Sequence, residues 1–148
     1  MERSELQFGA YEFKAPSTYA SRPPLKPTFV FVIDVSQFSH PIGFFPQVVQ
    51  SIKMTLDYFQ NAENTSVCFI TFDVNIQFYT IPLSGGEPTL LWVADITDPF
   101  VPLPKSKLML NLVEDRERID IFLDKLLVMH TPDHKKYQSP FICTGAAI

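Results

Sequence analysis

The chain has 148 residues, enough for one domain with a real hydrophobic core. Its formal net charge of −4 excludes a protein that binds nucleic acid non-specifically, because such binding needs a basic surface. No apolar run reaches the ~18–20 residues that span a bilayer, and the opening residues MERSE lack the apolar stretch of a secretory signal. The two cysteines form no C-x-x-C pair, which predicts that this chain holds no structural zinc. We therefore predict a cytoplasmic protein.

The first 27 residues are predicted to form an extended arm. They show no periodic apolar pattern and contain four prolines, at positions 16, 23, 24 and 27. Aromatic residues alternate with polar ones in this stretch, which indicates some strand character. We place the boundary of the packed domain at residue 28, so that residues 28–148 form the folded unit.

A strand and a helix are predicted next. Residues 28–34 (TFVFVID) form an apolar run that ends in an acid, which is typical of a strand buried on both faces of a parallel sheet. Apolar residues then recur three and four positions apart, which predicts an amphipathic helix near 43–60. Gly43 and Pro46 mark its first turn.

Three further strands and a second helix complete the predicted core. Residues 66–73 and 76–81 flank the turn-forming DVN and should make a β-hairpin, and 89–95 is another apolar strand. A second helix is expected over 114–129, with an acidic start and Pro132 after its end. Residues 144–148 have the pattern of a helix start, so we expect the chain to be a truncated part of a longer domain.

This order predicts an α/β fold with an open, mostly parallel sheet. Residues 28–34, 66–73 and 89–95 would form its parallel strands, with 76–81 antiparallel at one edge. The two long helices would cover the sheet. Ligands of open α/β sheets bind at the carboxyl ends of the strands, which makes Asp34 and Ser36 the first candidate site.

Three interpretations of this site compete. The first is a metal-ion adhesion site, D-x-S-x-S, whose oxygens coordinate Mg²⁺. Here the third position is Phe38, and the threonine ligand of the partner motif T-x-T-G-x-A is replaced by Ile142 in ICTGAAI. Two ligand positions therefore lack an oxygen, and we predict no metal among Asp34, Ser36, Phe38 and Ile142.

The second interpretation is an aspartyl nucleophile, and the third is purely structural. A nucleophile of the haloacid dehalogenase type needs D-x-D, but Ser36 stands where the second acid belongs. In the structural interpretation, which we favour, Asp34 and Ser36 hydrogen-bond the backbone and start the following helix. His130 and His134 are four apart, but TPD between them ends the helix, so we expect both at a solvated helix exit.

Four stretches together resemble one family. They are YEFKAPSTYASRPP at 11–24, FVIDVS at 31–36, ITFD at 70–73 and ADITDPFVP at 94–102. These residues are similar to the arm and the trunk domain of the cargo-binding subunit of the COPII vesicle coat. The paralogous coat subunit fits the arm less well. The resemblance implies a von Willebrand A-like fold for the trunk.

The resemblance also implies a function. The protein would be a non-catalytic coat component in ER-to-Golgi transport, cytoplasmic and peripheral on the ER membrane. Its trunk would dock on the trunk of the partner coat subunit, and other surfaces would receive cargo sorting peptides. The family's zinc site would lie outside this chain, so no cofactor is expected here. The arm would link to a β-sandwich that is missing, which leaves residues 1–22 open to pairing with a second copy.

Overall fold

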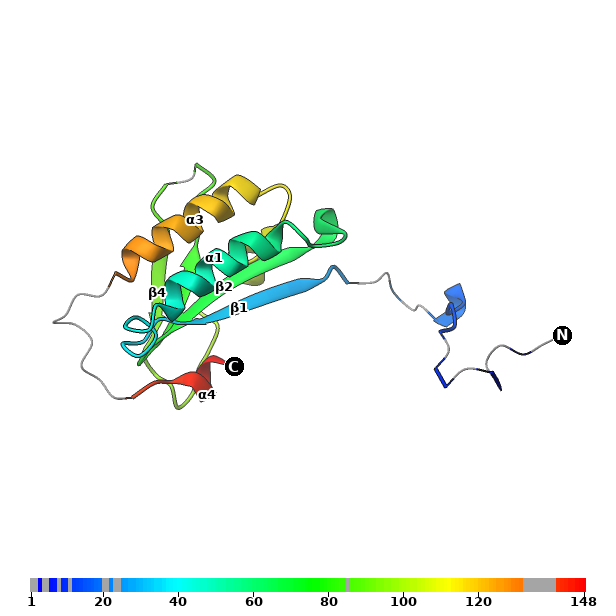
Figure 1. Cartoon of the computed structure of the whole chain (residues 1–148), viewed down its shortest axis with the longest axis horizontal. Coiled ribbons are helices and arrows are strands. Elements are labelled where there is room, and N and C mark those ends of the chain that lie inside the picture. The colour runs from blue at the N-terminus through cyan, green and yellow to red at the C-terminus, as the bar shows by residue number, and fades with distance from the viewer. Residues whose placement is uncertain are drawn as a thin grey trace.

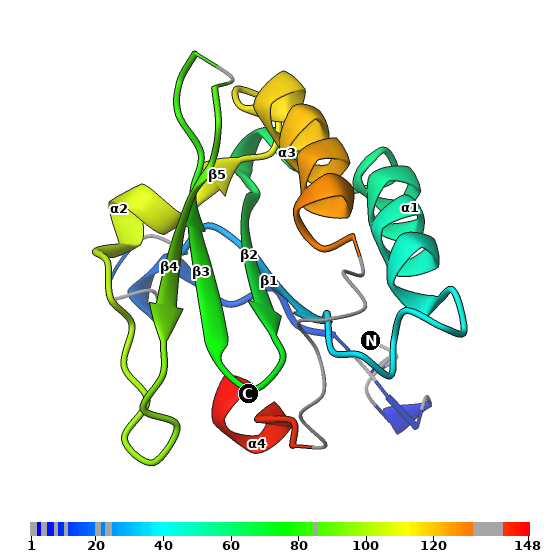
Figure 2. The same ribbon diagram turned by 90° about the vertical axis from the view of Figure 1, so that its left-hand side faces the viewer.

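The computed structural model describes residues 3, 6–7, 9–10, 12–19, 22, 25–84, 86–131 and 141–148. Within them, five strands form one sheet in the order β1-β2-β3-β4, with β5 beside β2 (Figures 1 and 2). The strands are β1 (Thr28–Asp34), β2 (Ser66–Phe72), β3 (Ile76–Thr80), β4 (Thr89–Val93) and β5 (Leu110–Asn111). The helices are α1 (Phe44–Leu56), α2 (Lys105–Leu108), α3 (Arg116–Met129) and α4 (Thr144–Ala147), with short 3-10 turns at Ser17–Tyr19 and Ala62–Asn64.

The predicted α/β class is confirmed, and the sheet is mixed. β1 and β2 are parallel, whereas β2–β3 and β3–β4 are antiparallel, so β1, β2 and β4 point the same way. The segment predicted at 76–81 is antiparallel as expected. However, β3 lies between β2 and β4, so its predicted edge position is wrong. The connection after β3 brings β4 back along it, and β4 takes the edge instead.

Helices α1 and α3 lie side by side on one face of the sheet (Figure 2). The first strand, the second strand and both helices contribute to one core between these layers. Phe122 of α3 is 1% exposed, and its ring centroid lies 5.3 Å from Phe69 of β2 and 5.1 Å from Tyr79 of β3. Leu123 and Leu126 continue the same apolar stripe of α3. Because the residues of this stripe all face the core, apolar residues recur at helical spacing in the sequence, which is why the helix could be predicted.

The opposite face of the sheet carries a second, smaller apolar cluster. Phe72 and Phe78 lie at its centre, and Leu108 of α2 and Cys143 beside α4 pack against them. The cysteines are free thiols, and burial raises the pKa of Cys68. The short helices α2 and α4 thus lie on this face of the sheet, whereas the long helices α1 and α3 cover the other face.

β1 does not have the two buried faces that its sequence predicted. It pairs only with β2 among the described residues and lies at the edge of the sheet. Phe29, Val30 and Val32 are 42%, 48% and 37% exposed. A continuous apolar run shows that a strand can be buried on both faces, but its position among the other elements determines whether it is.

Both predicted long helices are present, with shorter ends. α1 stops at Leu56 because the next amides, of Asp57 and Tyr58, bond carbonyls three residues back instead of four. Gly43 precedes α1 with φ of 68°, a left-handed conformation that glycine adopts without strain. α3 begins at Arg116, and the expected helix start near residue 144 is confirmed as α4.

The described residues of the arm are all exposed. Ser17–Tyr19 form a 3-10 turn, and none of the described arm residues belongs to a strand, so the strand character predicted there is not found in this part of the chain. Figure 1 shows the arm leading away from the sheet. Self-pairing through residues 1–22 stays a prediction. No helix among the described residues has the length and apolar character needed to cross a membrane.

Candidate functional site

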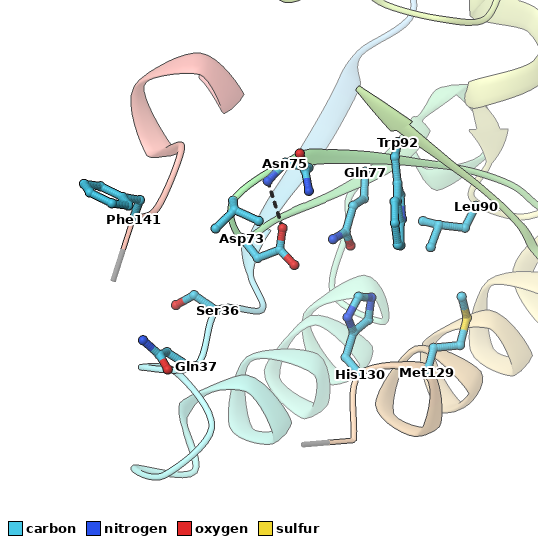
Figure 3. A pocket seen from close by; sticks show the side chains of 11 residues that line it. Ser36, Gln37, Asp73, Asn75, Gln77, Leu90, Trp92, Met129, His130 and Phe141 are labelled. Atoms are coloured by element: carbon cyan, nitrogen blue, oxygen red, sulfur yellow. Dashed lines mark hydrogen bonds between the residues drawn. The ribbon is translucent and has the colours of Figure 1, made fainter. Parts of the chain in front are cut away.

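A cavity of about 390 Å³ lies at the carboxyl ends of β1 and β2, beside the end of α3. Figure 3 shows the side chains that line it. Both polar and apolar side chains line it. The lining residues are Ser36, Gln37, Asp73, Val74, Asn75, Gln77, Leu90, Trp92, Met129, His130 and Phe141.

The predicted candidate Asp34 lies beside this cavity and has a structural role. Its Oδ1 accepts a hydrogen bond of 2.7 Å from the backbone N–H of Ser36. Ser36 is buried, its Oγ accepts from the N–H of Phe38, and its carbonyl accepts from the hydroxyl of Ser39. The prediction that the Asp34 carboxylate bonds the local backbone is confirmed. These bonds hold the turn that leads into α1.

The two positions without ligand oxygens behave differently from each other. The Phe38 side chain is 52% exposed. Ile142 packs against the cluster under the sheet, and its neighbour Cys143 donates its N–H to the carbonyl of Asp73 over 2.9 Å. The structure therefore brings the 142–148 motif to the end of β2. Within the described ranges, no three His, Cys, Asp or Glu side chains are grouped to hold a metal ion.

A buried polar network lies next to the cavity, and two of its residues, Gln77 and His130, line it. The hydroxyls of Thr71 and Tyr79 lie 2.6 Å apart, and the Thr71 hydroxyl donates to Gln77 Oε1 over 2.6 Å. Tyr79 Oη also lies 2.8 Å from His130 Nε2. All four residues are at most 4% exposed. The network connects β2, β3 and the end of α3 across the sheet.

One arrangement of protons gives each of these contacts a donor: Thr71 donates to Gln77 Oε1, Tyr79 donates to Thr71, and His130 donates from Nε2 to Tyr79. The roles of Tyr79 and His130 depend on the tautomer of the imidazole, and Tyr79 Oη also lies 3.3 Å from Gln77 Oε1. In the neutral tautomer with its proton on Nε2, Nδ1 is an acceptor. Nδ1 is buried and has no hydrogen-bond partner among the described residues.

Burial keeps His130 neutral. Removal from water lowers its pKa from 6.5 to about 4, since the charged form loses its hydration, and the nearby Asp73 carboxylate opposes this shift only in part. An electrostatic interaction with His40 lowers the pKa of His130 further.

His130 is the functional residue that the sequence interpretation placed wrongly. It was expected at a solvated helix exit, but it is 4% exposed and its ring packs 5.9 Å from Phe45. His134 lies outside the described residues. One signal was available: Gln77 and Tyr79 are two apart in a strand, so both face the side that the helices cover. Polar side chains in such positions need partners.

Comparison with known proteins shows the family. Residues 24–148 match the sequence model of the Sec23/Sec24 trunk domain. The chain belongs to this trunk domain family. The predicted resemblance is confirmed, and the relatives described next are Sec24 proteins.

Two relatives and one solved structure illustrate this. "Protein transport protein SEC24 A" of Arabidopsis thaliana is 41% identical over 128 residues, and human "Protein transport protein Sec24A" is 40% identical over 129 residues. These alignments cover 86% and 87% of this chain but 12% of each relative. The crystal structure of the human COPII-coat protein Sec24c matches with a TM-score of 0.70 at 32% identity, over 87% of this chain and 18% of that one. The trunk-family chain thus spans about an eighth of the length of these relatives.

Proposed function

We propose that this trunk-family chain acts in a non-catalytic component of the COPII vesicle coat, in cargo selection and coat assembly during ER-to-Golgi transport. The observation that carries the proposal is the match of residues 24–148 to the Sec23/Sec24 trunk domain. A 32% identical structure that is named as a COPII-coat protein supports it. The relatives bear the name of protein transport proteins.

The local chemistry of Asp34 supports a binding role over catalysis. A nucleophilic aspartate needs a neighbouring acid to protonate the leaving group. Ser36 occupies that place, and its backbone N–H already engages the Asp34 carboxylate. The Asp34 carboxylate thus stabilises the turn that precedes α1.

The partners follow from the same family membership. We propose that the chain meets the partner COPII coat subunit through that subunit's trunk domain, and that cargo sorting peptides bind elsewhere on the assembled coat. The site of action would be the cytoplasmic face of the ER membrane, with peripheral contact. Pairing of residues 1–22 with a second copy belongs to this proposal too.

Titration of the purified chain with the purified partner coat subunit, followed by calorimetry, tests the coat assignment. We expect saturable one-to-one binding at micromolar concentration or tighter. In the control titration, a von Willebrand A-like domain from outside this family replaces the chain, since it shares the fold but not the family's surface. Equal heats from both proteins, or no heat from either, would contradict the proposal.

We also propose that the degenerate adhesion positions hold no Mg²⁺. Phe38 and Ile142 support this, because neither side chain has an oxygen to offer. A ligand at a hundred times its Kd stabilises a protein by about 2.7 kcal/mol. Thermal melting in EDTA and in millimolar magnesium should give one melting temperature. An upward shift in magnesium that is lost in Asp34→Asn would establish the metal-dependent alternative.

A further inference from the structure

The cavity at the carboxyl ends of β1 and β2 contains two acceptors whose bonding is incomplete. Asp73 is 8% exposed, and its Oδ1 accepts one hydrogen bond, from the N–H of Asn75 over 2.9 Å. No ion pair of Asp73 is found among the described residues. The second acceptor is Nδ1 of His130, a buried atom without a partner in the described part of the chain. A buried carboxylate without a cation is costly, so such groups are normally paired.

The described residues that line the cavity carry charge of one sign. Among them, Asp73 is the only carboxylate and none is a lysine or an arginine. Lowering of the His130 pKa to about 4 keeps that ring uncharged near neutral pH. The cavity is therefore electronegative and offers lone pairs, which suits a ligand that brings a positive charge and N–H donors.

The opposite wall offers an aromatic face. Trp92 of β4 stands directly across from Gln77 of β3 in the strand register, and it is 66% exposed. Figure 3 shows the Trp92 ring beside Leu90, across the cavity from Asp73, with the His130 ring and Met129 below. The face of an indole ring attracts cations, and a guanidinium group more than an ammonium because it is planar and weakly hydrated.

We propose that this cavity binds the arginine side chain of a peptide segment from another protein. The guanidinium would pair with the Asp73 carboxylate, donate one N–H to Nδ1 of His130 and lie against the Trp92 ring. A cavity of about 390 Å³ falls within the usual range of ligand sites and accommodates one long side chain. The inference rests on the cavity alone, so failure of the partner-subunit titration would leave it standing.

The chain supplies its own reporter for a test. Trp92 is the single tryptophan and lines this cavity, so fluorescence excited selectively at tryptophan reports on it. The probe is the tripeptide N-acetyl-Gly-Arg-Gly-amide, and its control is the same peptide with citrulline, which has nearly the shape of arginine without its charge. We expect a saturable change with the arginine peptide and at least about tenfold weaker binding of the citrulline peptide.

Two substitutions locate the binding. Asp73→Asn removes the charge but keeps an oxygen for the Asn75 N–H, and it should weaken the arginine peptide at least about tenfold. Asp95→Asn is the matched control, because Asp95 follows β4 as Asp73 follows β2 and likewise accepts the N–H two residues on, from Thr97. It should leave the affinity within about twofold.

The outcomes are distinct. If Asp73→Asn does not fold, as judged by circular dichroism, the comparison of arginine with citrulline on the unaltered chain still decides. Equal responses to the two peptides, no response to either, or undiminished binding in a folded Asp73→Asn variant would each overturn the proposal. An ordered water bound to Nδ1 of His130, with no peptide response, would mean that solvent satisfies the site.

Discussion

β1 and β2 are nearly alike as sequences and quite unlike as structures. Each has seven residues, five of them apolar, and they run in parallel register from Thr28↔Ser66 to Asp34↔Phe72. Yet five residues of β2 are buried and only one of β1. β2 has β1, β3 and β5 as neighbours, whereas β1 has β2 alone among the described residues. Burial is a property of the position in the sheet, and hydrophobicity only permits it.

One phenylalanine from each strand shows this difference in burial. Phe69 of β2 is 3% exposed and its ring centroid lies 5.3 Å from that of Phe122, whereas Phe29 of β1 is 42% exposed and its ring centroid lies 4.5 Å from that of Phe59. Phe69→Ala should lower the free energy of unfolding by about 3–5 kcal/mol, through lost burial and the cavity left behind. Phe29→Ala should cost about 1 kcal/mol. Urea denaturation measures both.

This pair of variants is the strictest test of the difference in burial between β1 and β2. Equal losses would mean that β1 is buried as deeply as its sequence suggested. The two variants remove the same atoms from the same face of the sheet, so each serves as the control for the other.

A second difference lies in the polar residue that β2 carries toward the helices. Thr71 stands opposite Ile33 of β1 and anchors the network that ends at His130. The pKa of His130 is about 4 when folded and near 6.5 when unfolded. The unfolded chain therefore takes up the proton first, and the free energy of unfolding should fall by up to about 3 kcal/mol as the pH falls from 6.5 to 4.

Urea denaturation at pH 7, 5.5 and 4.5 measures this loss. In His130→Gln the loss over this range should be much smaller, although the variant starts from a lower stability at pH 7. His40→Gln should reduce the slope only slightly, because His40 makes the smallest contribution to the shifted pKa of His130. A parent chain with constant stability from pH 6.5 to 4.5 would show that His130 is hydrated and charged in the fold.

The smallest effect concerns the open side of β1. The N–H of Val35 bonds the carbonyl of Phe72, and successive amides of a strand point in opposite directions. The amides of Phe31 and Ile33 thus face β2, and those of Val30 and Val32 face the open edge. Hydrogen exchange followed by nuclear magnetic resonance should show faster exchange at Val30 and Val32.

Amides of β2 supply the reference for this measurement. Cys68 and Ile70 lie opposite Val30 and Val32, inside the sheet, and both should exchange slowly. Equal protection of Val30 and Phe31 would show that something pairs with the open edge in solution, such as a second copy of the chain.

The sequence by itself determined the kinds and order of the long elements, whereas the short α2 and β5 were not predicted. The 3.6-residue period of α3 and the apolar runs of the strands reflect local geometry, so they were legible without the fold. The same holds for Asp34 and Ser36, whose hydrogen bond spans two residues. The family motifs were also legible because they are contiguous.

Only the tertiary structure decided what depends on residues far apart in the chain. β4 took the edge predicted for β3, and β1 stayed half exposed, because strand order is set by contacts that no local pattern encodes. The bond between Tyr79 and His130 spans 51 positions, and it turned an expected surface histidine into a buried one. The acceptors that line the cavity come from β2, β3 and α3. Their proximity is a consequence of packing, and no spacing in the sequence records it.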